Sequence, residues 1–262
     1  MTSAADDLAL VVAAAREAGE LAADLRGKGL EIEYKAGNSP VTNADLAADQ
    51  LLKARLRGAR PDYGWLSEET ADDPDRLTRR RLFVVDPIDG TRAFLNDKPF
   101  WSVSIAIVEG ERPIAGAVFA PQLGQMYAAC AGGGATLNEA PIRASDICEI
   151  EGCGMVGDPR SFAHPRWTTP WPRMRIEPRN STALRMCEVA SGAFDATLAM
   201  AAKFDWDLAA ADLIATEAGC MVGDQAGRPF RYNGAQPVQL SMICAAPGLA
   251  PLILERVRLI AL

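Results

Sequence analysis

The chain has 262 residues, 49% hydrophobic and 23% charged, which is typical of a globular protein with one large domain or two coupled halves. Its net charge of −7 and pI of about 4.9 argue against a nucleic-acid backbone as partner, because such binding depends on clustered Lys and Arg. No apolar run has the length of a membrane span, and Asp6 and Asp7 precede the first apolar run, so neither a membrane protein nor a signal peptide is predicted.

The cysteines and the histidine exclude further classes of site. The six cysteines form no C-x-x-C pair and have no zinc-site spacing, which predicts reduced thiols in a cytoplasmic protein. His164 is the only histidine, so we do not expect a catalytic triad or a zinc site built on histidine.

Two helices are predicted in the first 60 residues. Residues 6–27 carry apolar side chains on one helical face. After a loop rich in Gly, Asn, Ser and Pro, Thr42 has the position of an N-cap with Asp45 three residues later, which predicts a helix over 43–57. Taken alone, Asp45 is a favourable charge in a helix first turn, and Lys35 in the loop is a surface lysine.

A short strand and two acidic residues come next. Leu66 indicates the end of the strand, and Glu68 and Glu69 follow it. Taken alone, these two glutamates predict an exposed acidic turn. Residues 72–81 are charged and polar and predict a solvated loop.

The stretch Leu82–Thr91 carries the strongest functional pattern. Four apolar residues predict a buried strand that ends at Asp86 and Pro87, followed by Asp-Gly-Thr at the start of a short helix over 92–95. A helix start binds phosphate well, but two carboxylates beside it repel a phosphate unless a cation lies between them. We therefore expect a magnesium-dependent phosphate site, with Asp86 and Asp89 as metal ligands and Gly90 and Thr91 facing the phosphate.

The remaining elements continue an alternating α/β pattern. Strands are predicted over 101–109, 112–120 and 125–131, and the glycines at 132–134 mark the expected boundary between an N-terminal half (1–134) and a C-terminal half (135–262). The C-terminal half is expected to hold strands over 154–157, 194–200, 220–222 and 239–245, a loop over 158–175, and helices over 183–191, 208–218 and 249–257. At the start of the second of these helices, Asp205 suits an N-cap, whereas Asp207 lies inside the first turn, where it can point at a ligand.

The local pattern also distinguishes between two phosphatase mechanisms. Phosphatases that form an aspartyl-phosphate carry Asp-x-Asp-Gly-Thr, and here the position of the nucleophile is Pro87. The alternative is direct attack by a water activated by magnesium, which prefers hard oxygen ligands.

Together these motifs resemble those of the inositol monophosphatase family. The resemblance covers Lys35 to Gly219 and includes the loop from Lys35 to Asp45, Glu68-Glu69, Asp86-Pro87-Ile88-Asp89-Gly90-Thr91 and Trp206-Asp207-x-Ala-Ala. It implies a layered α-β-α-β-α fold of the inositol monophosphatase and fructose-1,6-bisphosphatase type, a homodimer, and lithium-sensitive phosphatase activity with two or three Mg²⁺ ions.

The resemblance also implies roles for individual residues. Glu68, Asp86, Asp89, Asp207 and the Ile88 carbonyl match metal ligands. Asp45 and Thr91 match the pair that positions the attacking water together with Glu68. The backbone N–H groups of Gly90 and Thr91 match the phosphate cradle, and the substrate side is expected to include Lys35, Ser181, Lys203 and Asp207.

The substrate class is predicted less sharply than the chemistry. The segment before Trp206 lacks the glutamate that holds the ring hydroxyls in inositol monophosphatases, and Lys203 suits a second phosphate instead. The family's Gly-Ser is here Asn180-Ser181, which leaves that contact open. We favour a 3'(2'),5'-bisphosphate nucleotide as the small phosphorylated substrate, with inositol monophosphate and histidinol phosphate as alternatives.

An alternative from a different class is a non-catalytic, metal-binding regulatory protein. The presence of Asp45, Glu68, Thr91 and Asp207 counts against it, because a site that no longer turns over is expected to lose its water-positioning residues first.

Overall fold

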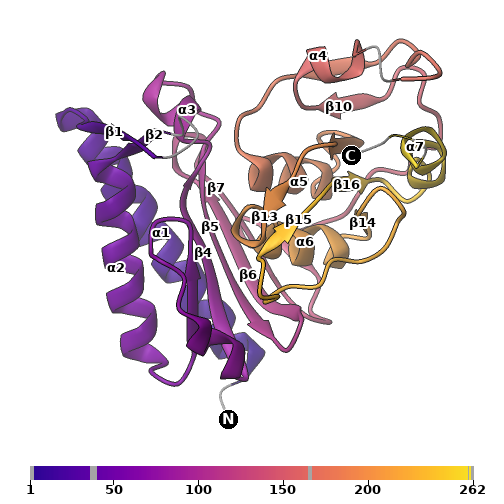
Figure 1. Cartoon of the computed structure of the whole chain (residues 1–262). Helices are drawn as coiled ribbons and strands as arrows, with labels where there is room; N and C mark the ends of the chain where they lie inside the picture. Colours follow the sequence, from indigo (N-terminus) through magenta and orange to yellow (C-terminus); the bar gives the residue numbers. More distant parts are fainter. Residues whose placement is uncertain (1–2, 36–39, 165–166, 259, 261–262) are drawn as a thin grey trace.

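A computed structural model describes residues 3–35, 40–164, 167–258 and 260 (Figure 1). Helices α1 (Ala4–Lys28) and α2 (Asn43–Ala59) cover one face of a seven-stranded sheet. Helices α5 (Thr182–Ala190) and α6 (Asp205–Glu217) cover its other face and separate it from a five-stranded sheet, against which α7 (Ala250–Val257) packs. These layers confirm the predicted alternating α-β-α-β-α architecture.

The large sheet has the strand order β3-β4-β5-β6-β7-β8-β9, in which β3 and β4 are parallel and all later neighbours are antiparallel. Its strands are β3 (Gly64–Ser67), β4 (Arg81–Asp89), β5 (Ser102–Glu109), β6 (Arg112–Ala120), β7 (Gln125–Cys130), β8 (Ala135–Leu137) and β9 (Ala140–Ile142). The second sheet has the order β11-β10-β12-β16-β14 and is made of β10 (Gly154–Val156), β11 (Arg175–Glu177), β12 (Ala196–Ala199), β14 (Met221–Gly223) and β16 (Met242–Ala245). Two short pairs complete the described strands: β1 (Ile32–Tyr34) with β2 (Pro40–Thr42), and β13 (Lys203–Phe204) with β15 (Val238–Gln239).

Strand β4 is apolar on both sides because helices cover both faces of the sheet. Phe83 and Val85 belong to the core under α1 and α2, whereas Leu82 and Val84 belong to the core under α5 and α6. This alternation follows from the two-residue repeat of a strand, and the burial of both sets explains the continuous apolar run in the sequence.

The predicted boundary at residue 134 lies in the turn between β7 and β8. Strands β8 and β9 follow it and still extend the large sheet, and α6 packs against that sheet from the C-terminal half. The division into residues 1–134 and 135–262 stays a prediction.

Two predicted loops contain more structure than expected. A 3₁₀ helix forms at Pro74–Thr78, and buried Arg76 donates to Asp72, to Asn233 and to the Gly234 carbonyl, so part of the segment is anchored rather than solvated. The segment after β10 forms the short helix α4 (Pro159–Phe162), whereas its residues 165–166 lie outside the described part.

In the described part of the chain, no helix combines the length and the apolar character that crossing a membrane requires. All six cysteines are free thiols, of which four are buried.

Candidate active site

The end of β4 holds the two aspartates of the central motif. We expected the strand to stop at Asp86, but it continues to Asp89 with a register shift against β5 between these two residues. The shift coincides with Pro87, which has no N–H to give to a ladder. Both aspartates are buried, and Asp86 accepts a hydrogen bond from the Ile88 N–H at 3.0 Å.

Gly90 makes the turn from β4 into helix α3 (Thr91–Leu95) possible. Its φ of 93° lies in the left-handed region, and an added Cβ would lie 3.0 Å from the Ser181 nitrogen and 3.1 Å from the Phe100 carbonyl oxygen. The Thr91 hydroxyl donates to the Ile88 carbonyl at 3.2 Å. The turn therefore brings Gly90, one of the two predicted phosphate-facing residues, directly against the start of α5.

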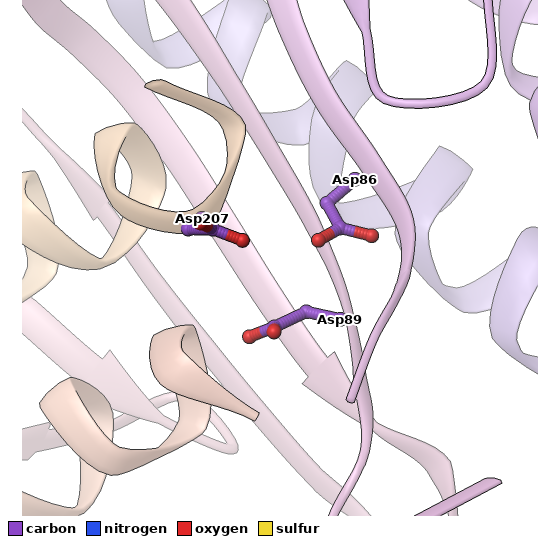
Figure 2. A group of neighbouring side chains, drawn as sticks. All are labelled: Asp86, Asp89 and Asp207. Carbon is purple, nitrogen blue, oxygen red and sulfur yellow. The ribbon is translucent and has the colours of Figure 1, made fainter. Parts of the chain in front are cut away.

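Asp207 reaches the same place from the other half of the chain. Possible ligand oxygens of Asp86, Asp89 and Asp207 all lie within 4.8 Å of one another, and Figure 2 shows the three carboxylates converging from β4 and α6. Asp207 also accepts the Phe204 N–H at 2.9 Å and so caps α6 itself. The N-cap role expected for Asp205 is wrong, because its carboxylate accepts from the Asn233 N–H and the Gln239 side chain.

Asp89 is held by the N-terminus of α5. It accepts a hydrogen bond from the Ser181 hydroxyl at 2.6 Å and from the Ala183 N–H at 2.7 Å, while the Ser181 oxygen accepts from the Leu184 N–H. These bonds orient a carboxylate that the fold removes from water. The Ser181 hydroxyl thus contacts Asp89, and its role toward a substrate stays a prediction.

Glu68 lies at the edge of this cluster and is not a member of the compact group of three. Lys35 Nζ lies 3.5 Å from Glu68 and 2.7 Å from Glu69. Burial raises the pKa of Glu68 to about 7, Lys35 opposes the shift, and the charges of Glu69, Asp207 and Asp89 add to it. Lys35, expected on the substrate side, therefore pairs with the two glutamates.

Asp49, one helical turn after Asp45, is a residue that the sequence did not single out. It is buried and accepts the Ser67 hydroxyl at 2.5 Å and the Thr70 hydroxyl at 2.6 Å, one on each carboxylate oxygen. Because these hydroxyls flank Glu68 and Glu69, Asp49 fixes the turn that presents them.

Asp45 forms the predicted capping box with Thr42. It accepts the Thr42 N–H at 2.8 Å and the Thr42 hydroxyl at 2.5 Å, and burial raises its pKa to about 6 despite these bonds. Strand β2, which ends at Thr42, contacts both α2, the helix of Asp45, and α3, the helix that begins at Thr91. The joint action of Asp45 and Thr91 on a water molecule stays a prediction.

Two cations act on the aspartates. Burial raises the pKa of Asp89, and the hydrogen bonds from Ser181 and Ala183 and the charge of Lys203 oppose that rise. Lys203 is also the largest charge effect on Asp207. Arg185 on α5 is buried, donates to the Thr182 hydroxyl at 3.1 Å and has a buried Nε without a partner among the described residues. Burial lowers the pKa of its guanidinium, and the charges of Asp89 and Asp207, followed by those of Asp158 and Glu188, oppose that shift. Sequence alone did not single out Arg185, although a single charged residue within the apolar run 183–187 indicates a buried charge with a specific role.

The carboxylates repel one another in the absence of a cation. Burial, together with the charges of Glu68, Asp89 and Asp207, holds the pKa of Asp86 well above its usual range, and burial raises that of Asp207 to about 6. At the 4.8 Å limit of the cluster, each ionised pair repels by about 3.5 kcal/mol at an effective dielectric of about 20. A buried set of hard oxygen donors with this repulsion fits a divalent cation such as Mg²⁺.

Comparisons with known proteins agree with this geometry. The pattern of the "Inositol monophosphatase family" matches residues 4–260. The chain is 33% identical over 235 residues to a histidinol-phosphatase of Chlorobaculum parvum, which covers 87% of this chain and 89% of that protein. It is 33% identical over 211 residues to the 3'(2'),5'-bisphosphate nucleotidase CysQ of Escherichia coli, with 79% and 85% covered.

Solved structures show the same relationship. An inositol monophosphatase of Thermotoga maritima superposes with a TM-score of 0.84 at 29% identity and covers 97% of both chains. The sequence match across nearly the whole chain, the layered fold and the acidic cluster lead to one conclusion: the chain belongs to the inositol monophosphatase family and is a phosphatase of that family.

Proposed function

We propose that the protein is a Mg²⁺-dependent phosphomonoesterase that acts without a covalent intermediate and prefers a 3'(2'),5'-bisphosphate nucleotide. The observation that carries this proposal is the convergence of Asp86, Asp89 and Asp207 within 4.8 Å, with the positively charged Lys203 and Arg185 acting on the same site.

The proposed metal ligands are the three clustered aspartates, Glu68 and the Ile88 carbonyl. When bound, two or three Mg²⁺ ions would lower the pKa of a water and stabilise the attacking and leaving oxygens. The hydrogen bonds to Asp89 from Ser181 and Ala183 hold one ligand in place, and those to Asp49 hold the turn that carries another.

The residues of this chain prepare the water and the phosphate. Asp45, with a pKa of about 6, is ionised at neutral pH and accepts a proton from the attacking water, which Thr91 and Glu68 position with it. The backbone N–H groups of Gly90 and Thr91 hold the phosphate. Pro87 excludes the aspartyl-phosphate route, because no carboxylate stands at the nucleophile position.

Lys203 and Arg185 support a substrate with a second phosphate. Four carboxylates carry four negative charges, and two divalent ions would neutralise them, so Lys203 and Arg185 would no longer be balanced by the clustered aspartates, although Asp158 and Glu188 still act on Arg185. A buried guanidinium with an unpartnered Nε then favours additional acceptor oxygens. The absence of a glutamate in segment 199–205 disfavours inositol monophosphate by comparison.

Three substrates measured side by side test this preference: adenosine 3',5'-bisphosphate, inositol 1-phosphate and histidinol phosphate. We expect the highest kcat/KM for the bisphosphate. A preference for inositol phosphate or histidinol phosphate would overturn the role given to Lys203.

A variant series tests the second-phosphate contact directly. Arg185→Gln and Lys203→Gln are expected to lower kcat/KM for adenosine 3',5'-bisphosphate by about tenfold or more, while adenosine 3'-monophosphate, which lacks the second phosphate, changes little. Arg160→Gln, which removes an exposed arginine paired with Asp158, is the matched control. Equal losses on both substrates would contradict the assignment.

We also propose that the protein is a lithium-sensitive homodimer in the cytoplasm. The family resemblance supports the lithium sensitivity and the homodimer, and the free thiols support a reducing compartment such as the cytoplasm. Light scattering and inhibition by LiCl test the first two, and a monomer or a lithium-insensitive enzyme would contradict them.

A further inference from the structure

Phe204 is an exposed aromatic residue at the edge of the acidic cluster. The residue is 44% exposed, although it belongs to β13 and directly precedes α6. Its backbone N–H donates a hydrogen bond to the Asp207 carboxylate at 2.9 Å, so the backbone of Phe204 directly contacts one member of the acidic cluster. Few apolar side chains of this size stay exposed among the described residues, and this one adjoins the active site.

The ring of Phe204 is held in a fixed orientation. It stacks on Trp206 with a centroid distance of 4.6 Å and an interplanar angle of 9°, and Trp206 packs against the core of the large sheet. Pairing of β13 with β15 fixes the backbone on the other side, with Phe204 opposite Val238. One face of the ring is therefore occupied by Trp206, and the exposed fraction belongs to a rigid, flat surface.

The neighbouring charge specifies what this surface fits. Lys203, the preceding residue of β13, lies opposite Gln239, so this short strand carries a cation and an aromatic residue immediately before the start of α6. A ligand with an anionic group and a flat, weakly polar ring matches both features, and every nucleobase has such a π-face.

We propose that the exposed face of Phe204 stacks on the planar base of a nucleotide substrate. This inference deepens the proposed function and rests on it for the placement of the phosphates. It implies that the base contributes to affinity separately from the phosphate groups, and that a sugar phosphate without a base lacks this contribution.

A matched ligand pair isolates the base. Adenosine 5'-monophosphate and ribose 5-phosphate share the sugar and the phosphate and differ in the base. Isothermal titration with Mg²⁺ present is expected to show roughly 5- to 150-fold tighter binding of adenosine 5'-monophosphate to the wild-type protein. Phe204→Ala is expected to remove that difference, whereas ribose 5-phosphate binding stays unchanged because the backbone N–H to Asp207 remains.

Further variants separate stacking from other roles. Phe204→Trp keeps an aromatic face and should keep the preference, while Phe204→Leu keeps apolar surface and should lose most of it. Leu252→Ala removes an exposed apolar side chain on α7 and serves as the control. Thermal melting of each variant checks that the fold is intact.

Two results would overturn the inference: equal affinity of the wild-type protein for both ligands, or an unchanged preference in Phe204→Ala. A change of oligomeric state in Phe204→Ala without a change in preference would identify the surface as a contact between copies and would also overturn it. Failure of the proposed function is a different observation, namely no hydrolysis of any phosphate monoester, and the binding comparison does not depend on turnover.

Discussion

Removing one charge from the acidic cluster should stabilise the metal-free protein while it destroys activity. Asp86→Asn is the cleanest perturbation, because an amide oxygen can still accept the Ile88 N–H at 3.0 Å. Asp86 belongs to two of the three pairs within 4.8 Å, and at about 3.5 kcal/mol for each fully ionised pair at that separation the two repulsions together amount to about 7 kcal/mol. The pKa of Asp86, which burial and the neighbouring carboxylates hold well above its usual range, means that this carboxyl group binds a proton more readily in the folded protein, so the relief is smaller than that sum.

We therefore expect about 2 kcal/mol of actual stabilisation at pH 7.5 without metal, which corresponds to a Tm higher by roughly 4–8 °C for a chain of this size. Calorimetry in EDTA measures the shift in Tm. When the same unfolding measurement is repeated with Mg²⁺, the metal should stabilise the variant less than it stabilises the wild-type protein. Activity should fall at least 100-fold. A metal-free variant less stable than the wild-type protein would refute the idea that repulsion dominates this cluster.

Three further predictions address other parts of the site. Asp89→Asn should abolish phosphate release and leave the circular dichroism spectrum unchanged, because its amide oxygen can keep the Ala183 N–H; unchanged turnover would refute its role as a ligand. Asp49→Asn leaves either the Ser67 or the Thr70 hydroxyl without its acceptor, at a cost of about 1–2 kcal/mol. The Mg²⁺ concentration that gives half-maximal rate should therefore rise severalfold while kcat stays nearly constant. A lower kcat with an unchanged Mg²⁺ requirement would contradict a positioning role for Asp49. Carboxyl groups with raised pKa values, about 6 for Asp45 and Asp207 and about 7 for Glu68, bind protons more tightly when folded, so the metal-free protein should lose stability as the pH rises from about 4 to about 7. Over the same range Mg²⁺ should bind more tightly, and melting curves with and without Mg²⁺ that run parallel across this range would disprove the coupling.

Local chemistry made the central motif predictable from the sequence. The apolar run before Asp86, the proline after it and the glycine at position 90 each specify a backbone conformation within a few residues, so the strand, turn and helix start follow from short-range rules. The inward direction of Asp207 was predictable for the same reason, since it lies in the first turn of a helix, and the fold places it beside Asp86 and Asp89.

Contacts between distant segments were not predictable in this way. The bonds from Ser181 and Ala183 to Asp89 join residues more than 90 positions apart. The N-cap expected for Asp205 fails because Asn233 and Gln239, which only tertiary packing brings close, use its carboxylate instead. Arg185 and Asp49 were missed because each has an ordinary local explanation until the fold places it beside the acidic residues.

The central claim is that catalysis takes place at the acidic cluster. The most direct test compares Mg²⁺-dependent phosphate release by the wild-type protein and by Asp207→Asn, with release in EDTA as the zero point. Release should be absent in EDTA, rise with added Mg²⁺ in the wild-type protein, and fall at least 100-fold in the variant at every Mg²⁺ concentration. Equal release in EDTA, or an Asp207→Asn rate close to that of the wild-type protein, would contradict catalysis at the acidic cluster.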